Sequence, residues 1–172
     1  MTPHGRLRLI LTRHAKSDWD DPSLDDHDRP LNARGRRAAR SLGDWLASRG
    51  YEPEEVLCST ALRCTQTWEE ATRAALGVRP EICCDSALYH AEPEMMLKLL
   101  RKATAPIVMM IGHNPGIAAF AHSLLVRPPQ SSEFRSYPTA ATVVADFQGE
   151  RWAEADLLGQ GSLRDFVRFD GG

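Results

Sequence analysis

Residues 106–116 read PIVMMIGHNPG: the most apolar run of the chain, Pro106–Ile111, passes directly into the polar segment Gly112–Gly116. Because this run does not alternate between apolar and polar residues, it suits a strand buried on both faces. Such strands occur in parallel sheets that carry helices on either side. The run therefore predicts a central strand and an α/β fold.

Further strands and helices are expected to alternate around this central strand. Shorter β-favouring runs predict strands at Leu7–Thr12, Glu55–Cys58 and Glu81–Cys84. Helical spacing and capping residues predict helices at Asn32–Gly50, from the Ser59–Thr60 caps to about Leu76, at Pro93–Lys102 and at Gly116–Leu125. This order predicts a three-layer sandwich in which helices flank a mostly parallel central sheet.

The last third of the chain predicts a loop followed by a hairpin. Arg127–Thr139 is rich in proline and serine, which indicates a loop. Thr142–Phe147 and Trp152–Leu157 resemble two strands joined at Gln148–Glu150, and they would add an antiparallel edge to the sheet. Because no linker divides the chain, residues 1–172 are expected to form a single domain.

Composition narrows the possible partners and surroundings. The formal net charge of the 172 residues is -2, so neither nucleic acid nor an anionic membrane is an expected partner. The polar start of the chain does not predict a secretory segment, and no apolar stretch reaches transmembrane length, so the cytoplasm is the expected location. A monomer is the default expectation. None of the four cysteines forms a Cys-x-x-Cys pair, so reduced thiols are expected.

Three polar segments stand out because each follows a predicted strand: Leu11–Ser17, Cys58–Arg63 and Ile111–Gly116. In an open α/β sheet, ligands bind at the carboxyl ends of the strands. If the three strands are parallel, the segments converge at one edge of the sheet. This edge would bring together two arginines and two histidines, namely Arg13, His14, Arg63 and His113.

These four side chains are suited to phosphoryl transfer without a metal or cofactor. Arg13 and Arg63 would clamp phosphate oxygens through their guanidinium groups. A neutral His14 is a competent nucleophile toward phosphorus, and the two positive charges are expected to lower its pKa. His113 would donate a hydrogen bond to a phosphate oxygen and so stabilise charge in the transition state.

Two further residues are candidates for binding substrate. Ser17 follows His14 by three residues and could donate its hydroxyl, although a structural loop hydroxyl is an equal alternative. Asn114 stands at the start of a helix whose N-terminus favours anions. Gly112 and Gly116 would let the backbone pack closely around them.

Other phosphatase chemistries fit the sequence poorly. A cysteine phosphatase needs five residues between its cysteine and arginine, whereas Cys58 and Arg63 are separated by four. His27-Asp28 is a lone pair without metal-ligand spacing, so no metal site is expected. The acidic stretch Asp18–Asp28 predicts an exposed loop. A substrate rim or a weak cation site at this loop remains an alternative.

The three segments together resemble the histidine phosphatase superfamily, the phosphoglycerate-mutase-like proteins. The family's Arg-His-Gly motif corresponds to Arg13-His14-Ala15, and its Ser-x-x-x-Arg-x-x-Gln-Thr segment corresponds to Ser59–Thr67. Its second histidine follows a buried strand, as does Gly112-His113. Residues 13–17, 28–32 and 137–139 are most similar to the SixA-like branch, so that the resemblance extends over nearly the whole chain.

The resemblance implies a phosphoglycerate-mutase-like fold and a His14 that is phosphorylated during turnover. Mutase-like members also use a glutamate as general acid. The matching region offers Asp85, His90, Glu92 and Glu94 without a convincing motif. A missing acid would favour phosphohistidine on a protein as the substrate, because imidazole is a better leaving group than an alkoxide. A small-molecule phosphomonoesterase and a non-catalytic phosphohistidine-binding module remain alternatives.

Overall fold

The computed structural model describes residues 5–74 and 80–172, and within these ranges it contains one six-stranded sheet in the order β3-β2-β4-β1-β5-β6. The strands are β1 (Arg6–Arg13), β2 (Glu55–Ser59), β3 (Ile82–Asp85), β4 (Ile107–Gly112), β5 (Thr142–Gln148) and β6 (Ser162–Val167). The helices are α1 (Ala33–Arg49), α2 (Leu62–Ala74), α3 (Pro93–Leu100), α4 (Gly116–Leu124) and α5 (Ser132–Ser136).

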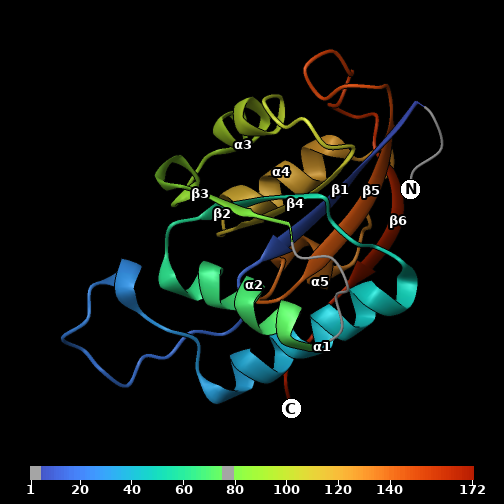
Figure 1. Cartoon of the computed structure of the whole chain (residues 1–172). Coiled ribbons are helices and arrows are strands. Elements are labelled where there is room, and N and C mark those ends of the chain that lie inside the picture. The colour runs from blue at the N-terminus through green and yellow to red at the C-terminus, as the bar shows by residue number, and fades with distance from the viewer. Residues whose placement is uncertain (1–4, 75–79) are drawn as a thin grey trace.

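The sheet is mixed, and its parallel part carries the predicted α/β order. β1 pairs with β4, β4 with β2 and β2 with β3, all in parallel, whereas β5 pairs antiparallel with both β1 and β6. Helices cover both faces of the sheet (Figure 1). The predicted three-layer fold with a mostly parallel sheet is therefore confirmed.

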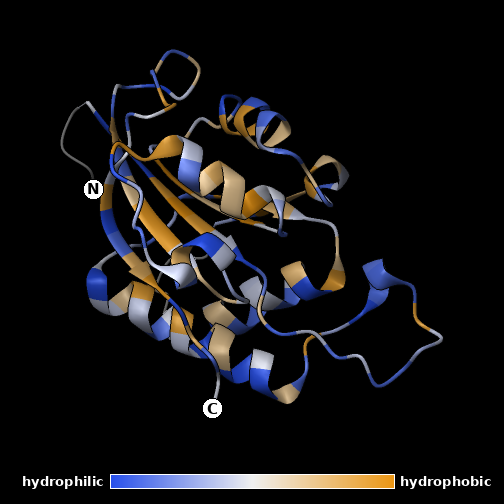
Figure 2. Ribbon diagram, turned by 180° about the vertical axis from the view of Figure 1, so that it is seen from behind, coloured by the Kyte–Doolittle hydropathy of each residue, from blue (hydrophilic) through white to orange (hydrophobic). Residues whose placement is uncertain are grey.

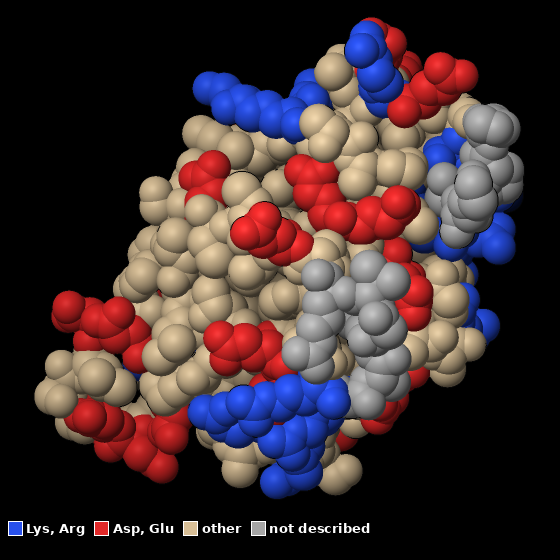
Figure 3. All heavy atoms as spheres, viewed as in Figure 1, with Lys and Arg blue, Asp and Glu red and all other residues tan. Residues whose placement is uncertain are grey.

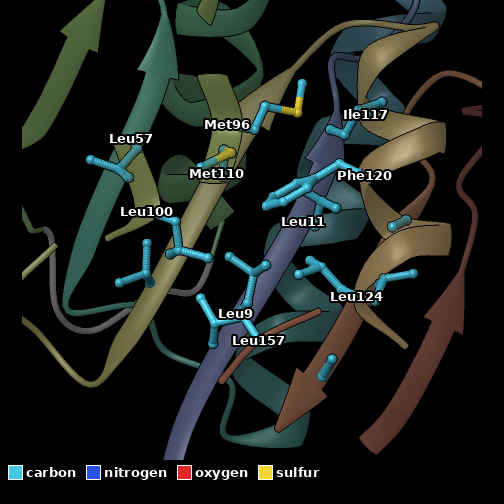
Figure 4. Packing of buried hydrophobic residues seen from close by; sticks show 14 of the residues in the cluster. Leu9, Leu11, Leu57, Met96, Leu100, Met110, Ile117, Phe120, Leu124 and Leu157 are labelled. Atoms are coloured by element: carbon cyan, nitrogen blue, oxygen red, sulfur yellow. The ribbon is translucent and has the colours of Figure 1, made fainter. Parts of the chain in front are cut away.

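The central strands are apolar because both of their faces are buried. All six residues of β4 are buried; Val108 and Met110 pack with α3 and α4, and Met109 and Ile111 pack with α1 and α2. Figure 2 shows this apolar centre, and Figure 4 shows Leu9 and Leu11 of β1 lying with residues of α4. Burial of these side chains, each contributing roughly 1.5–3 kcal/mol, fixes the strand ends in space.

The capping signals of the first helix are confirmed. The side chain of Asn32 accepts a hydrogen bond from the backbone N–H of Gly35 at 2.8 Å, and Gly50 takes a left-handed conformation with φ of 70° after the last turn. The predicted end of the second helix near Leu76 lies outside the described residues. Among the residues that the structure describes, no helix is long and apolar enough to cross a membrane.

The predicted hairpin after β5 is wrong. Trp152–Leu157 is a turn region rather than a strand, and the antiparallel partner of β5 is the later segment Ser162–Val167. The apolar residues of the turn region belong to the core: Trp152 is 1% exposed, and its indole N–H donates to the carbonyl of Ala105 at 2.8 Å. The apolar residues of Trp152–Leu157 therefore reflect a turn region that is buried against the core. The strand β6 lies at the sheet edge and is more exposed.

Two predicted loops contain short helical segments. The stretch after α4, expected to be loop from Arg127 to Thr139, includes the one-turn helix α5. The acidic stretch Asp18–Asp28 ends in a 3-10 helix, Asp26–Asp28, which the structure places between β1 and α1. Figure 3 shows acidic side chains gathered at the edge of the molecule where this loop projects.

Candidate active site

The carboxyl ends of β1, β2 and β4 bring three of the predicted side chains into one buried cluster. His14 follows β1, Arg63 lies in the first turn of α2 after β2, and His113 follows β4 (Figure 1). Their exposed fractions are 7%, 3% and 2%, and the centroids of the two imidazole rings are 5.3 Å apart. Parallel strand order therefore assembles residues that are about fifty positions apart in sequence.

The imidazole of His14 is oriented by its own backbone. Its Nδ1 lies 2.7 Å from the carbonyl oxygen of Ala15. Because a carbonyl can only accept, Nδ1 carries the hydrogen in the neutral ring, and Nε2 keeps a free lone pair. The Ala15 peptide is itself held, since its N–H donates to the Thr67 hydroxyl at 3.0 Å. The geometry thus leaves Nε2 as the nucleophilic nitrogen.

Both histidines of the cluster are held in the neutral form. Burial, with a smaller contribution from the charges of Arg63 and Arg13, lowers the pKa of His14 to about 3. Burial also lowers the pKa of His113 to about 3, with added contributions from His14 and Arg63. The predicted direction for His14 agrees with the structure, but desolvation, rather than the arginine charges, is its main cause.

The tautomer of His113 follows from two neighbours. Its Nδ1 accepts a hydrogen bond from Arg63 Nη2 at 3.3 Å, so Nε2 carries the hydrogen and donates to Ser59 Oγ at 2.8 Å. Ser59 was expected only as a helix cap. Its hydroxyl does accept a hydrogen bond from the N–H of Ala61 at 3.3 Å. The contact of Ser59 with His113 was not predicted, although the position of Ser59 at the end of a strand could have suggested it.

Two residues of the Ser59–Thr67 segment explain why that motif has its spacing. Thr67 donates its hydroxyl to the carbonyl of Arg63 at 2.7 Å while accepting from Ala15. Gln66 accepts from the N–H of Leu31 at 2.8 Å. Helix α2 is therefore fastened both to the segment that carries His14 and to the segment that precedes α1.

Arg13 is held in place by the segment that precedes β5. Its Nη1 donates to the carbonyl of Tyr137 at 3.1 Å, and Tyr137 is fully buried, with its hydroxyl donating to the carbonyl of Leu11 at 2.5 Å. Among the described residues, the buried Nε of Arg13 has no hydrogen-bond partner. A buried donor without a partner is costly, and a bound anion would satisfy it.

A cavity of about 370 Å³ opens beside His14 and Arg13. Its other lining residues come from the segment after β1 and from the loop before β5: Lys16, Ser17, Trp19, Arg29, Pro138 and Thr139. The lining thus includes three cationic side chains. The guanidinium of Arg29 also lies 3.2 Å from the centre of the Trp19 ring, and this pair forms one wall.

The acidic loop supplies a site contact that the sequence did not single out. Arg63 donates through Nη1 to the carbonyl of Asp26 at 2.6 Å and through Nη2 to its carboxylate at 2.9 Å. The same carboxylate accepts from Tyr89 and from Arg29. Partial burial would raise the pKa of Asp26, but these donors outweigh it and hold the pKa well below its usual range.

The two candidate substrate-binding residues are placed differently from each other. Ser17 is buried, lines the cavity and pairs its backbone with Leu31. Asn114 donates its amide N–H groups to the backbone carbonyls of Ser136 and Tyr137 at 2.8 and 3.0 Å, so these donors brace the Tyr137 segment. Its buried Oδ1 has no partner within the described residues.

Gly116 is needed for close packing beside His113. A Cβ at Gly116 would lie 1.8 Å from the carbonyl oxygen of Ala91, which no side chain could tolerate. The start of α4 and the segment before α3 therefore press directly against each other. Gly112, by contrast, has only ordinary side-chain contact at its Cβ position, so the close approach expected there is not required.

The three acidic candidates for a general acid lie on the connection from β3 to α3. Asp85 accepts from the N–H of Ala87 at 2.8 Å and so caps a short 3-10 helix. Glu92 and Glu94 are exposed at the first turn of α3. These placements assign helix-end positions to all three carboxylates.

Two arginines and two neutral histidines gathered at the carboxyl ends of parallel strands form a donor set suited to a phosphoryl group. The sequence profile of the Histidine phosphatase superfamily (branch 1) matches residues 9–85. A solved structure from Agrobacterium tumefaciens that carries the SixA name is 31% identical, with a TM-score of 0.75 and coverage of 94% of this chain and 97% of that one. The chain therefore belongs to the histidine phosphatase superfamily.

Two further comparisons point to the same branch. A structure from Nakamurella multipartitia that carries the SixA name has a TM-score of 0.78 at 28% identity, and the match covers 98% of this chain and 99% of that one. The phosphohistidine phosphatase SixA of Escherichia coli (strain K12) is 28% identical over 150 residues, which are 83% of this chain and 88% of that protein. The predicted resemblance to this family and its SixA branch is confirmed.

Proposed function

We propose that the protein is a phosphatase that forms a phosphohistidine intermediate on His14. The observation that carries this proposal is the 2.7 Å hydrogen bond from Nδ1 of His14 to the carbonyl of Ala15, which leaves the Nε2 lone pair unprotonated. A neutral imidazole fixed beside two arginines is ready to attack phosphorus without prior deprotonation. The pKa of about 3 keeps it in this form at neutral pH.

The reaction proceeds in two displacements. In the first, Nε2 of His14 forms a bond to phosphorus while the bond from phosphorus to the leaving group breaks. Arg13 and Arg63 neutralise the phosphoryl oxygens, and His113, beside Arg63, takes up a proton as the dianion binds and becomes a donor to them. In the second displacement, water attacks the phosphoryl group, inorganic phosphate leaves and His14 is regenerated.

The proposed substrate is phosphohistidine on another protein. A phosphoimidazole that is protonated on its other nitrogen leaves as neutral imidazole, so the site needs to supply only the nucleophile and the anion clamp. The name of the Escherichia coli relative, phosphohistidine phosphatase SixA, supports this substrate class. The cavity beside His14 is open to solvent, so a protein-borne phosphoryl group can reach it.

The test is release of phosphate from a phosphohistidine-containing protein by the wild type and by His14→Ala. His122→Ala serves as the matched control, because His122 is an exposed histidine on α4. We expect release by the wild type and the control and a loss of at least about a thousandfold in His14→Ala. Release that persists in His14→Ala would contradict the mechanism. Binding without release in every variant would favour a phosphohistidine-binding module.

A further inference from the structure

His90 has a backbone conformation that its surroundings must impose. It lies in the left-handed region with φ of 54°, which residues with a Cβ adopt at a cost. The segment is held on both sides of His90, since Tyr89 and Ala91 donate backbone hydrogen bonds to Ser86 and Leu88 at 3.1 and 3.2 Å. The close approach of Ala91 to Gly116 then presses this segment against the start of α4, next to His113.

The imposed conformation brings the His90 ring next to that of His113. Its centroid lies 5.1 Å from that of His113, which in turn lies 5.3 Å from that of His14. The side chain of His90 is 52% exposed, whereas His113 is 2% exposed. His90 therefore provides a half-exposed imidazole directly beside the buried histidine of the site.

Asp26 is the partner of this imidazole. Nε2 of His90 lies 3.4 Å from the Asp26 carboxylate, which also binds Arg63 at 2.9 Å. A carboxylate that accepts from one ring nitrogen orients the imidazole, and the other nitrogen is left for substrate. The contact engages Nε2, so the nitrogen left for chemistry is Nδ1. Asp26 thereby links this ring to the arginine of the phosphate clamp.

We propose that His90 is the proton donor to the leaving group, with Asp26 as its positioning residue. This proposal rests on the phosphatase function proposed above and extends its substrates to alkyl phosphate monoesters. An alkoxide is a poor leaving group without a proton, and histidine is the side chain best suited to supply one near neutral pH. His90 would thus act as the general acid in place of the carboxylates of the β3–α3 connection.

The proton balances over the two displacements. In the first, Nε2 of His14 bonds to phosphorus, the bond from phosphorus to the alkyl oxygen breaks, and that oxygen takes the proton from Nδ1 of the His90 imidazolium and leaves as the alcohol. In the second, the oxygen of water bonds to phosphorus and the bond to His14 breaks. The proton of the water passes to Nδ1 of His90, which restores the imidazolium.

The test compares two esters in one variant, His90→Asn. Asparagine tolerates the left-handed conformation and keeps an amide at the site, but it cannot supply the proton. An alkyl phosphate such as O-phosphoserine needs a donor, whereas 4-nitrophenyl phosphate releases a stabilised phenolate that does not. We expect kcat on O-phosphoserine to fall by about 100-fold or more and kcat on 4-nitrophenyl phosphate to change by less than about threefold.

The control and the outcomes separate this proposal from the phosphatase function itself. His122→Asn on α4 should leave both rates unchanged. Equal losses on the two esters in His90→Asn would indicate a structural role and overturn the proposal, and so would unchanged rates or a wild type that does not hydrolyse O-phosphoserine. Loss of 4-nitrophenyl phosphate hydrolysis in His14→Ala tests the phosphatase function independently, because that rate does not depend on a donor.

Discussion

The floor and the rim of the site are held in different ways. The floor, defined as His14, Arg63 and His113, is at most 7% exposed and is fixed at strand ends and at the start of α2. The rim, defined as Asp26, Tyr89 and His90, comes from the connections between β1 and α1 and between β3 and α3. The side chains of Asp26 and His90 are 42% and 52% exposed. In the proposed mechanism the floor would position the reacting phosphoryl group, and the rim would contact the leaving group.

The floor and the rim are also stabilised by different interactions. Floor residues are oriented by backbone carbonyls and buried hydroxyls, such as Ala15 and Thr67, whose contacts solvent does not screen. Rim residues are joined through one carboxylate, that of Asp26, whose ion pairs are partly exposed to water and salt. Substitutions in the floor should therefore reduce activity and the free energy of unfolding more than substitutions in the rim.

After His14 itself, the largest effect is expected at Arg63, which belongs to the floor and also binds the rim. Arg63→Met removes a donor fork from the phosphoryl oxygens and leaves Asp26 with only one of its two arginine partners, Arg29. We expect kcat/KM for 4-nitrophenyl phosphate to fall by about 100-fold or more. Arg73→Met is the matched control, since Arg73 lies on the same helix and is 65% exposed. A loss of less than about tenfold in Arg63→Met would contradict the clamp.

Acid should destabilise the floor through its two histidines. Their pKa values of about 3 lie below the unfolded value of 6.5, so the unfolded chain binds protons that the folded chain does not between these two pH values. The free energy of unfolding should therefore decrease as pH falls from about 6.5 toward 3, by about 1 kcal/mol per histidine at pH 5.5.

Denaturant unfolding at a series of pH values measures this effect. His14→Asn should reduce the slope between pH 6.5 and 4, because one buried histidine is gone, while His122→Asn should leave it unchanged. An unchanged slope in His14→Asn would show that His14 is not held neutral in the folded protein.

The link between α2 and the His14 segment should contribute a measurable part of stability. Thr67→Val keeps the shape of the side chain but leaves the buried N–H of Ala15 without an acceptor. We expect the free energy of unfolding to fall by about 1–3 kcal/mol. Thr65→Val is the control on the same helix, where the hydroxyl of Thr65 donates only to the carbonyl of Leu62. Equal losses in both variants would argue against the link.

The smallest effect on stability is expected in the rim. The pKa of Asp26 lies below its usual range in the folded protein, so its ion pairs stabilise the fold above about pH 4 and lose this contribution as pH falls further. Because the carboxylate is 42% exposed, Asp26→Asn should lower the free energy of unfolding at pH 7 by less than about 1 kcal/mol. Denaturant unfolding of the wild type and Asp26→Asn at low and high salt measures this difference in the free energy of unfolding. A larger loss that does not depend on salt would assign Asp26 to the floor.

The sequence predicted the floor because each floor residue follows a strand whose apolar pattern is clear. Parallel pairing then brings the strand ends together by necessity. The rim could not be predicted in this way, since Asp26 is one of six aspartates in a single loop and nothing in its local sequence distinguishes it. His90 is distinguished by its backbone conformation and by its contact with Asp26, both of which depend on tertiary packing.

The missed edge strand has a related cause. Trp152 and Leu157 gave the region after β5 a strand-like composition, but these residues belong to a turn region whose side chains are buried in the core. The true partner of β5, Ser162–Val167, carries serine, arginine and aspartate because it lies at the sheet edge, where the apolar signal is weak. Elements with one exposed face or edge are those for which local pattern is least informative.

The most direct test of the account is to trap the phosphorylated protein during turnover. The wild type is mixed with 4-nitrophenyl phosphate, quenched within milliseconds in alkali, which preserves a phosphoryl group on histidine, and analysed by mass spectrometry. The account predicts a phosphoryl group on His14 that disappears as substrate is exhausted and is absent in His14→Ala. A phosphoryl group on another residue, or turnover by His14→Ala at the wild-type rate, would contradict it.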